Sequence, residues 1–191
     1  MQYHLNGFVP GNLQLSESVR SKSTRQKYKQ IPDKTDVLII GCGPAGLTLA
    51  RQLSVFPEIK TCILESKPGP LLFGRADGVS CRTIEIMEAY NSSELILKES
   101  YWLNQISYWD SDSKNHNKIV CTKKVNDPRI GLSEFPHVVL NQARIHDLLL
   151  DGMKNSSCQL EPNYNCELID IEFNKKTYND PSKFPITATV L

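Results

Sequence analysis

The fold is decided by Val37-Leu38-Ile39-Ile40-Gly41-Cys42-Gly43-Pro44-Ala45-Gly46, an apolar run followed directly by a glycine-rich turn. The apolar run predicts a buried strand, and Pro44 is typical of the first position of a helix. Gly41 permits a tight turn, Gly43 leaves room for a phosphate against the backbone, and Gly46 lets the helix pack closely on the strand. We therefore expect the strand, turn and helix of a dinucleotide-binding unit, with N–H groups at the helix start facing an anion.

A second apolar run completes this pattern. Thr61-Cys62-Ile63-Leu64 predicts the next strand, and Glu65 follows it, 19 residues after Gly46. A carboxylate in that place accepts hydrogen bonds from a ribose and repels a 2′-phosphate. The predicted cofactor-binding residues here are Gly41, Gly43, Pro44, Ala45, Gly46, Glu65 and the adjacent Ser66. The alternative interpretation is a glycine turn that holds no ligand.

Composition excludes several classes of partner. The 191 residues include 22 basic and 21 acidic ones, a net charge of +1, which favours neither a nucleic acid nor a membrane surface. There is no apolar stretch of membrane-spanning length and no secretory signal. The six cysteines form no Cys-x-x-Cys pair and predict reduced thiols in the cytoplasm, without a disulfide framework or a metal site. Residues 1–34 read as a polar arm, for which a mitochondrial presequence is the alternative.

Beyond a βαβ start at about 35–65, the patterning predicts short elements of both kinds. Helices are expected near 83–90, 93–98 and 142–154. Strands are expected near 103–109, 118–122, 137–140, 167–173 and 186–191. The strands at 103–109 and 118–122 are expected to form a hairpin. No third long parallel strand is obvious, and the last strand has no turn or polar tail after it. We therefore expect a chain cut short within a longer α/β pattern.

Two further segments point to a known family. They are Gly74-Arg75-Ala76-Asp77-Gly78, which is followed by Cys81-Arg82-Thr83, and Phe135-Pro136-His137-Val138-Val139-Leu140-Asn141-Gln142-Ala143-Arg144. Together with the glycine turn, they resemble the flavin-dependent aromatic hydroxylases, in the branch that holds phenol 2-monooxygenase and 3-hydroxybenzoate 4-monooxygenase. The opening residues 1–8 are similar to the hydroxybenzoate enzymes. The resemblance covers nearly the whole chain but only the N-terminal part of the family's length.

The resemblance implies an α/β fold, with a Rossmann-like FAD-binding βαβ unit and part of a mixed β-sheet substrate domain, truncated. The 1–34 arm would precede a partial FAD-binding domain at 35–191. That domain would divide into the βαβ unit and active-site loop (35–100), a strand hairpin insertion (101–135) and a strand–helix–strand return (136–191). The implied chemistry is that NADPH reduces FAD and O₂ is then used to hydroxylate a phenol ortho to its hydroxyl. Members of the family are often homodimers.

The resemblance also assigns roles to individual residues. Asp77 matches the catalytic aspartate that contacts the substrate hydroxyl, and a carboxylate there favours the more nucleophilic phenolate. An ordinary Asp-Gly turn is the alternative. His137 corresponds to a residue on the substrate's carboxylate side, with a satisfied core histidine as the alternative. Arg75, Gln142 and Arg144 match FAD-contacting positions, although this branch often carries Gln at the first; helix capping and a solvated arginine are the alternatives for the other two.

One family motif is missing, because the second FAD motif begins with a Gly-Asp pair and the sequence contains none. The sequence thus predicts an FAD-dependent, NADPH-consuming monooxygenase acting on a substrate of the phenol or 3-hydroxybenzoate type, here as an N-terminal fragment inactive alone. One alternative is a truncated, non-catalytic remnant with weak or no FAD binding. Another is an NAD-linked dehydrogenase that uses the same glycine pattern.

Overall fold

The computed structural model describes residues 31–127, 131–177, 179–180 and 182–191. The polar arm expected at 1–34 therefore lies outside the described residues, apart from 31–34. The described residues form two compact units, which are treated separately below. The Rossmann-like unit comprises 31–73 and 143–191, and the loop–hairpin unit comprises 74–142.

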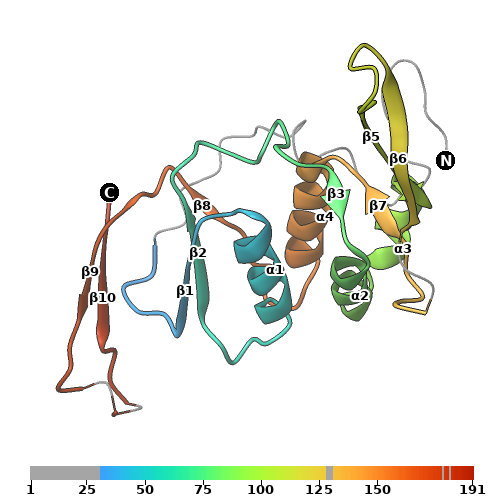
Figure 1. Cartoon of the computed structure of the whole chain (residues 1–191). Coiled ribbons are helices and arrows are strands. Elements are labelled where there is room, and N and C mark those ends of the chain that lie inside the picture. Colours follow the sequence, from blue (N-terminus) through green and yellow to red (C-terminus); the bar gives the residue numbers. More distant parts are fainter. Residues whose placement is uncertain (1–30, 128–130, 178, 181) are drawn as a thin grey trace. The chain divides into compact units, whose positions relative to one another are not determined.

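The Rossmann-like unit is built on a parallel sheet of strand order β1-β2-β8. Its elements are β1 (Val37–Ile40), α1 (Pro44–Leu53), β2 (Thr61–Glu65), all but the first residue of α4 (Gln142–Lys154), β8 (Asn163–Tyr164), β9 (Leu168–Phe173) and β10 (Ile186–Val190). Strands β1 and β2 pair from Val37↔Thr61 to Ile40↔Leu64. Figure 1 shows α1 and α4 on the same side of this sheet. The predicted strand–helix–strand start is confirmed.

Helix α4 approaches α1 at Gly152, which has no side chain. On α1, Leu47 and Ala50 are fully buried. On α4, a Cβ added to Gly152 would lie 2.5 Å from Nε of Arg51, which is on α1. Beyond α4, the N–H of Cys158 donates to the carbonyl oxygen of Ser54 at 3.1 Å. These contacts hold α4 against the helix that follows the glycine turn.

Strand β8 is the third parallel strand, which the sequence did not reveal. It pairs with the end of β2 through Leu64↔Asn163 and Glu65↔Tyr164. It is only two residues long because Pro162 before it has no N–H to donate and Asn165 after it has a left-handed backbone, with φ 57°. A strand of this length carries no alternation of polar and apolar residues, so its sequence contains no strand signal.

The loop–hairpin unit combines two antiparallel sheets with two short helices. Its elements are β3 (Gly78–Val79), α2 (Cys81–Ala89), α3 (Ser93–Glu99), β4 (Tyr101–Leu103), β5 (Gln105–Ser111), β6 (Ile119–Asn126) and β7 (His137–Val139). The first sheet has the order β3-β7-β4, and the second is the β5–β6 hairpin. Val138 on β7 and Ile84 on α2 are fully buried. The predicted helices, hairpin and β7 are present, whereas β3 and β4 were not predicted as separate strands.

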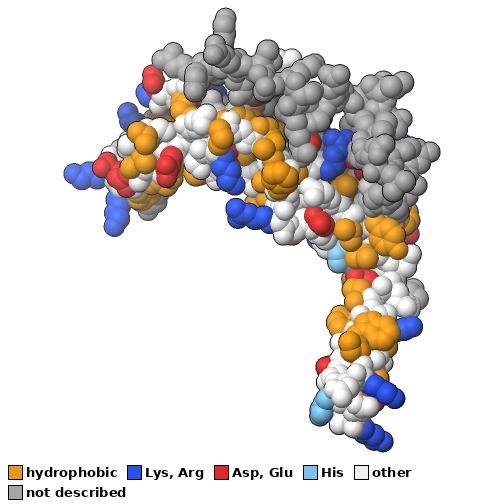
Figure 2. Space-filling view, turned by 90° about the horizontal axis from the view of Figure 1, so that it is seen from above, with side chains coloured by type: hydrophobic (Ala, Val, Ile, Leu, Met, Phe, Trp, Pro, Cys, Tyr) orange, Lys and Arg blue, Asp and Glu red, His pale blue; other side chains and the backbone are white. Residues whose placement is uncertain are grey.

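The β5–β6 hairpin is open to solvent. Figure 2 shows hydrophobic side chains exposed along it, and Trp109 and Ile119 are 63% and 75% exposed.

The elements of the two units confirm the predicted α/β class, while the finer division at 35–100, 101–135 and 136–191 stays a prediction. In the described part of the chain, no helix is long and apolar enough to cross a membrane.

Candidate functional site

The glycine turn joins the end of β1 to α1. Gly41 has φ 95°, a left-handed conformation that glycine adopts without strain, and its N–H donates to the carbonyl oxygen of Leu64 at 2.7 Å. A Cβ added to Gly41 or Gly43 would meet nothing within 4 Å, so the space beside the turn is open. At Gly46 the opposite holds, because an added Cβ would lie 2.1 Å from the carbonyl oxygen of Gly41. The helix therefore starts in contact with the turn, and the turn faces open space.

The start of α1 is suited to an anion. Pro44 occupies the start of the helix, and Gly43 before it is extended, with φ −72° and ψ 177°, and provides no side-chain cap. Gly43, Pro44 and Ala45 are all exposed. The first N–H groups of a helix have no partner within the helix and lie at its positive dipole end. The residues present thus fit a pyrophosphate approaching the backbone, as the sequence predicted.

Glu65 is held beside this turn by hydrogen bonds. Its Oε2 accepts the N–H of Cys42 at 2.9 Å, and its Oε1 accepts the N–H of Lys67 at 3.0 Å and the hydroxyl of Ser66 at 3.4 Å. Burial would raise the pKa of Glu65, but these hydrogen bonds and the charge of Lys67 outweigh it and lower the pKa below 4.5. Glu65 is therefore an anion next to the glycine turn, and an ionised carboxylate has lone pairs left for a ribose.

The buried side chains of Cys42 and Tyr164 lie near Glu65. Burial, with the charge of Glu65, raises the pKa of the Cys42 thiol to about 12. Tyr164, which pairs with Glu65 across strands β2 and β8, is 9% exposed, and its hydroxyl has no hydrogen-bond partner among the described residues. Burial and then the nearby Cys42 and Glu65 raise the pKa of this tyrosine. Sequence reasoning missed Tyr164, because only the pairing of β2 with β8 brings it next to Glu65.

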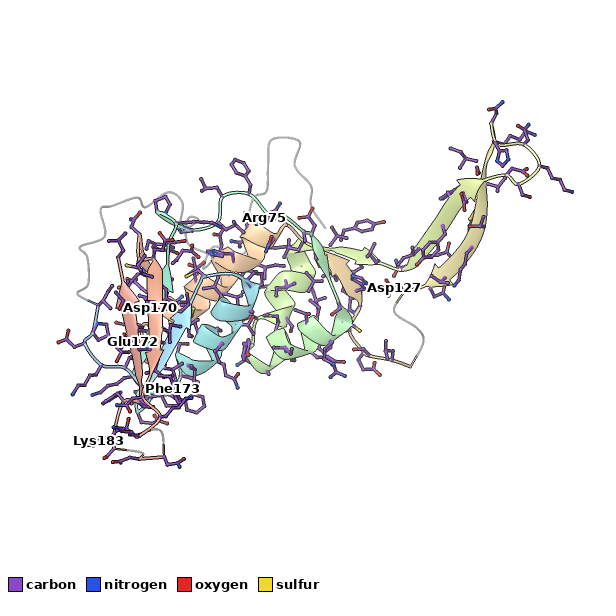
Figure 3. The ribbon with its side chains drawn as sticks, turned by 60° about the vertical axis from the view of Figure 1, so that its left-hand side comes forward. Arg75, Asp127, Asp170, Glu172, Phe173 and Lys183 are labelled. Carbon is purple, nitrogen blue, oxygen red and sulfur yellow. The ribbon has the colours of Figure 1, made fainter. Side chains whose placement is uncertain are left out.

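In the loop–hairpin unit, the segment 74–77 before β3 is hydrogen-bonded to Leu140 and Gln142, at the C-terminal end of the unit. The N–H of Arg75 donates to Oε1 of Gln142 at 2.8 Å, and the N–H of Leu140 donates to the carbonyl oxygen of Asp77 at 2.8 Å. Figure 3 labels Arg75 on this segment. A Cβ added to Gly74 would lie 2.9 Å from Cβ of Gln142, so only glycine permits the close approach. The backbone of Asp77 is thus fixed, while its side chain is exposed.

His137 stands on β7, close to this segment. Its Nδ1 lies 2.8 Å from Oδ2 of Asp127, and both side chains are partly buried. A Cβ added to Gly78 would lie 3.6 Å from Nε2 of the same ring. The structure therefore brings His137 next to Gly78, the residue after Asp77, and pairs it with an acid that sequence reasoning missed. Asp127 belongs to no motif, and no sequence signal marks it.

Arg144 is a predicted site residue on α4, in the Rossmann-like unit. It lies two residues after Gln142, so its side chain leaves α4 on roughly the opposite side, about 200° away. Its charge acts on Asp151 farther along α4: burial raises the pKa of Asp151, and Arg144 and Lys154 partly offset the rise. Among the described residues, no group of three His, Cys, Asp or Glu side chains can hold a metal ion, and all six cysteines are free thiols.

Comparison with known proteins identifies the family. A family model described as an FAD binding domain matches residues 34–172. The chain belongs to this FAD-binding family. It is 45% identical over 190 residues to 3-hydroxybenzoate 4-monooxygenase of Comamonas testosteroni, and the match covers 100% of this chain and 29% of that protein. It is 26% identical over 158 residues to a phenol 2-monooxygenase of Aspergillus fumigatus, 83% of this chain and 24% of that protein.

Solved structures show a similar fold. The structure of aklavinone-11 hydroxylase with FAD and aklavinone superposes with a TM-score of 0.63 at 17% identity, covering 83% of this chain and 30% of that one. The chain thus spans less than a third of the length of these proteins. The resemblance to the family of FAD-dependent monooxygenases is confirmed.

Proposed function

We propose that this flavoprotein chain forms part of an FAD-dependent monooxygenase that hydroxylates a substrate of the phenol or 3-hydroxybenzoate type ortho to its hydroxyl. The observation that carries the proposal is the open glycine turn at the start of α1, with the anionic Glu65 hydrogen-bonded to its backbone. The substrate class is supported by the 45% identity, over the whole chain, to a 3-hydroxybenzoate 4-monooxygenase.

In the Rossmann-like unit, the residues of the turn would hold the cofactor. The N–H groups around Gly43 and Ala45 would bind the pyrophosphate, and Glu65, with Ser66 beside it, would accept hydrogen bonds from the ribose. On the family resemblance, Arg75, Gln142 and Arg144 are proposed as further FAD contacts. When bound, FAD supplies the electron transfer to O₂ that amino-acid side chains cannot perform.

In the loop–hairpin unit, Asp77 is proposed as the catalytic residue. Its exposed carboxylate extends from a backbone that the hydrogen bonds of Leu140 and Gln142 hold in place. A carboxylate in this position can accept the proton of the substrate hydroxyl, which makes the ring more nucleophilic. His137 is proposed to face the carboxylate side of a hydroxybenzoate.

The remaining attributes belong to the same proposal and rest on the family resemblance. NADPH would be the electron donor and O₂ the second substrate. The protein would act in the cytoplasm, as a homodimer. We propose no nucleic acid or membrane as a partner, consistent with the net charge of +1.

The first test is FAD binding by the purified chain, measured by calorimetry. Gly43→Ala places a methyl group in the open space beside the turn and should weaken binding by about tenfold or more, the equivalent of one or two lost backbone hydrogen bonds. Gly69→Ala is the matched control, since a Cβ there also meets nothing within 4 Å but lies outside the turn. Absence of FAD binding, or an equal effect of both variants, would refute the assignment of the turn.

The second test is turnover. A full-length, FAD-loaded monooxygenase that contains these 191 residues should oxidise NADPH in the presence of 3-hydroxybenzoate or phenol and form the ortho-hydroxylated product, whereas the 191 residues alone are expected to be inactive. Asp77→Asn should lower kcat by about a hundredfold or more, because it removes the proton acceptor. NADPH oxidation by the 191 residues alone would contradict the expected inactivity of the fragment, and an unchanged kcat in full-length Asp77→Asn would contradict the role of Asp77.

A further inference from the structure

Asp127 makes a side-chain hydrogen bond at the junction of the β5–β6 hairpin with the three-stranded sheet. It directly follows β6, where Figure 3 labels it, and its N–H donates to the carbonyl oxygen of Asn104 at 3.1 Å. Its Oδ2 lies 2.8 Å from Nδ1 of His137, and the two side chains are only 22% and 29% exposed. The carboxylate is therefore fixed through its own backbone and is partly shielded from water.

His137 is fixed from the other side by the sheet. It lies on β7, the central strand of the order β3-β7-β4, and pairs there with Leu103. Its ring extends toward Gly78 on β3, where a Cβ would stand 3.6 Å from Nε2. Because Gly78 has no side chain, Nε2 reaches the strand that begins immediately after Asp77. The ring thus has one nitrogen at Asp127 and the other near the proposed catalytic loop.

The chemistry of the pair determines what each nitrogen can do. An ionised carboxylate only accepts hydrogen bonds, so Nδ1 must carry the hydrogen that Asp127 accepts. The hydrogen bond at one ring nitrogen sets the protonation of the other, so in the neutral ring Nε2 is left with its lone pair. Acids that hold a histidine in this way orient the ring as well as selecting its tautomer.

We propose that Asp127 is a positioning residue that fixes the tautomer and orientation of His137, so that Nε2 alone is presented to the aromatic substrate. This inference rests on the proposed function. Beside a substrate carboxylate, the lone pair of Nε2 takes up a proton from water, and the N–H so formed donates a hydrogen bond to the carboxylate while Asp127 balances the charge of the ring. A phenol without a carboxylate makes no such contact. Asp127 is therefore a determinant of specificity for hydroxybenzoates over simple phenols.

The direct test is the tautomer of His137, read from the ¹⁵N shifts of its ring by NMR in the purified chain at alkaline pH. The parent should show hydrogen on Nδ1 and a lone pair on Nε2. Asp127→Ala should move the population toward hydrogen on Nε2, and the isosteric Asp127→Asn, whose amide can donate as well as accept, should also lose the single tautomer. Asp110→Ala, in the exposed part of the same hairpin, is the control and should change nothing. An unchanged tautomer in folded Asp127→Asn would overturn the proposal.

The kinetic test uses a full-length, FAD-loaded monooxygenase that contains this chain, with two substrates. Asp127→Asn should raise KM for 3-hydroxybenzoate by about tenfold with kcat changed less than about twofold, and should leave KM for phenol unchanged. An equal rise for both substrates would overturn the specificity role. Absence of turnover in the full-length parent would count against the proposed function, whereas the NMR result would still decide whether Asp127 controls His137.

Discussion

Gly46 is the position in the glycine turn that should tolerate a side chain least. In Gly46→Ala, the new Cβ would lie 2.1 Å from the carbonyl oxygen of Gly41 and 3.3 Å from Cγ2 of Ile39. Contacts below 3.0 Å are essentially never observed, so the helix and the turn must separate by about 0.9 Å, the difference between 3.0 and 2.1 Å. The obstacle is a backbone carbonyl, which cannot swing aside as a flexible side chain can.

The magnitude follows from two opposing effects. Forcing a carbon into a packed contact costs about 1–3 kcal/mol, and the upper end applies here because the separation also disturbs the fully buried Leu47 and Ala50. Alanine is better than glycine inside a helix by about 1 kcal/mol, which offsets part of this cost. We therefore expect the free energy of unfolding to fall by about 2 kcal/mol. For a chain of this size, the melting temperature should fall by about 4–8 °C.

The assay is urea and thermal unfolding followed by circular dichroism, without cofactor. Gly43→Ala is the matched control: it adds the same methyl group three residues earlier, where none of the described residues lies within 4 Å of the added Cβ. Its loss of stability should stay below about 1 kcal/mol. An unchanged midpoint for Gly46→Ala, or equal losses in the two variants, would refute the argument that close packing of α1 on the turn requires glycine.

Three further predictions concern groups around the turn. Because the folded-state pKa of Glu65 is lowered, this residue should stabilise the protein above about pH 4.5 and lose its contribution as the pH falls through the folded pKa. Glu65→Gln should flatten that part of the pH profile of stability measured by urea unfolding. An unaltered profile would contradict this. Cys42, with its pKa near 12, should resist iodoacetamide in the folded protein while the exposed Cys121 reacts, and mass spectrometry that finds both labelled equally fast would contradict this. Tyr164→Phe should leave stability unchanged or raise it by up to about 1 kcal/mol, because it removes a buried hydroxyl that has no hydrogen-bond partner among the described residues. A clear loss in urea unfolding would count against this.

Elements with strong local signals were predictable from the sequence. The bounds of α4 at Gln142–Lys154 coincide with the predicted helix, because its apolar spacing is visible in a single window. The βαβ start was predictable for the same reason, with glycine and proline marking the turn. In contrast, β3 and β8 are two residues long and exist as strands only through their pairing with β7 and β2. The local pattern of polar and apolar residues does not specify which strands pair, so these two strands could not be predicted.

By itself, the sequence determined the glycine turn, the helix behind it and the acid at the end of the next strand, because each depends on the conformational range of a few neighbouring residues. The family followed from the same short segments. Only the tertiary structure decided that Gln142 fastens the backbone of Arg75, 67 residues away, and that Asp127 holds His137. It likewise placed Tyr164 beside Glu65. These contacts depend on strand register and on where a loop is fastened, which chain neighbours do not specify.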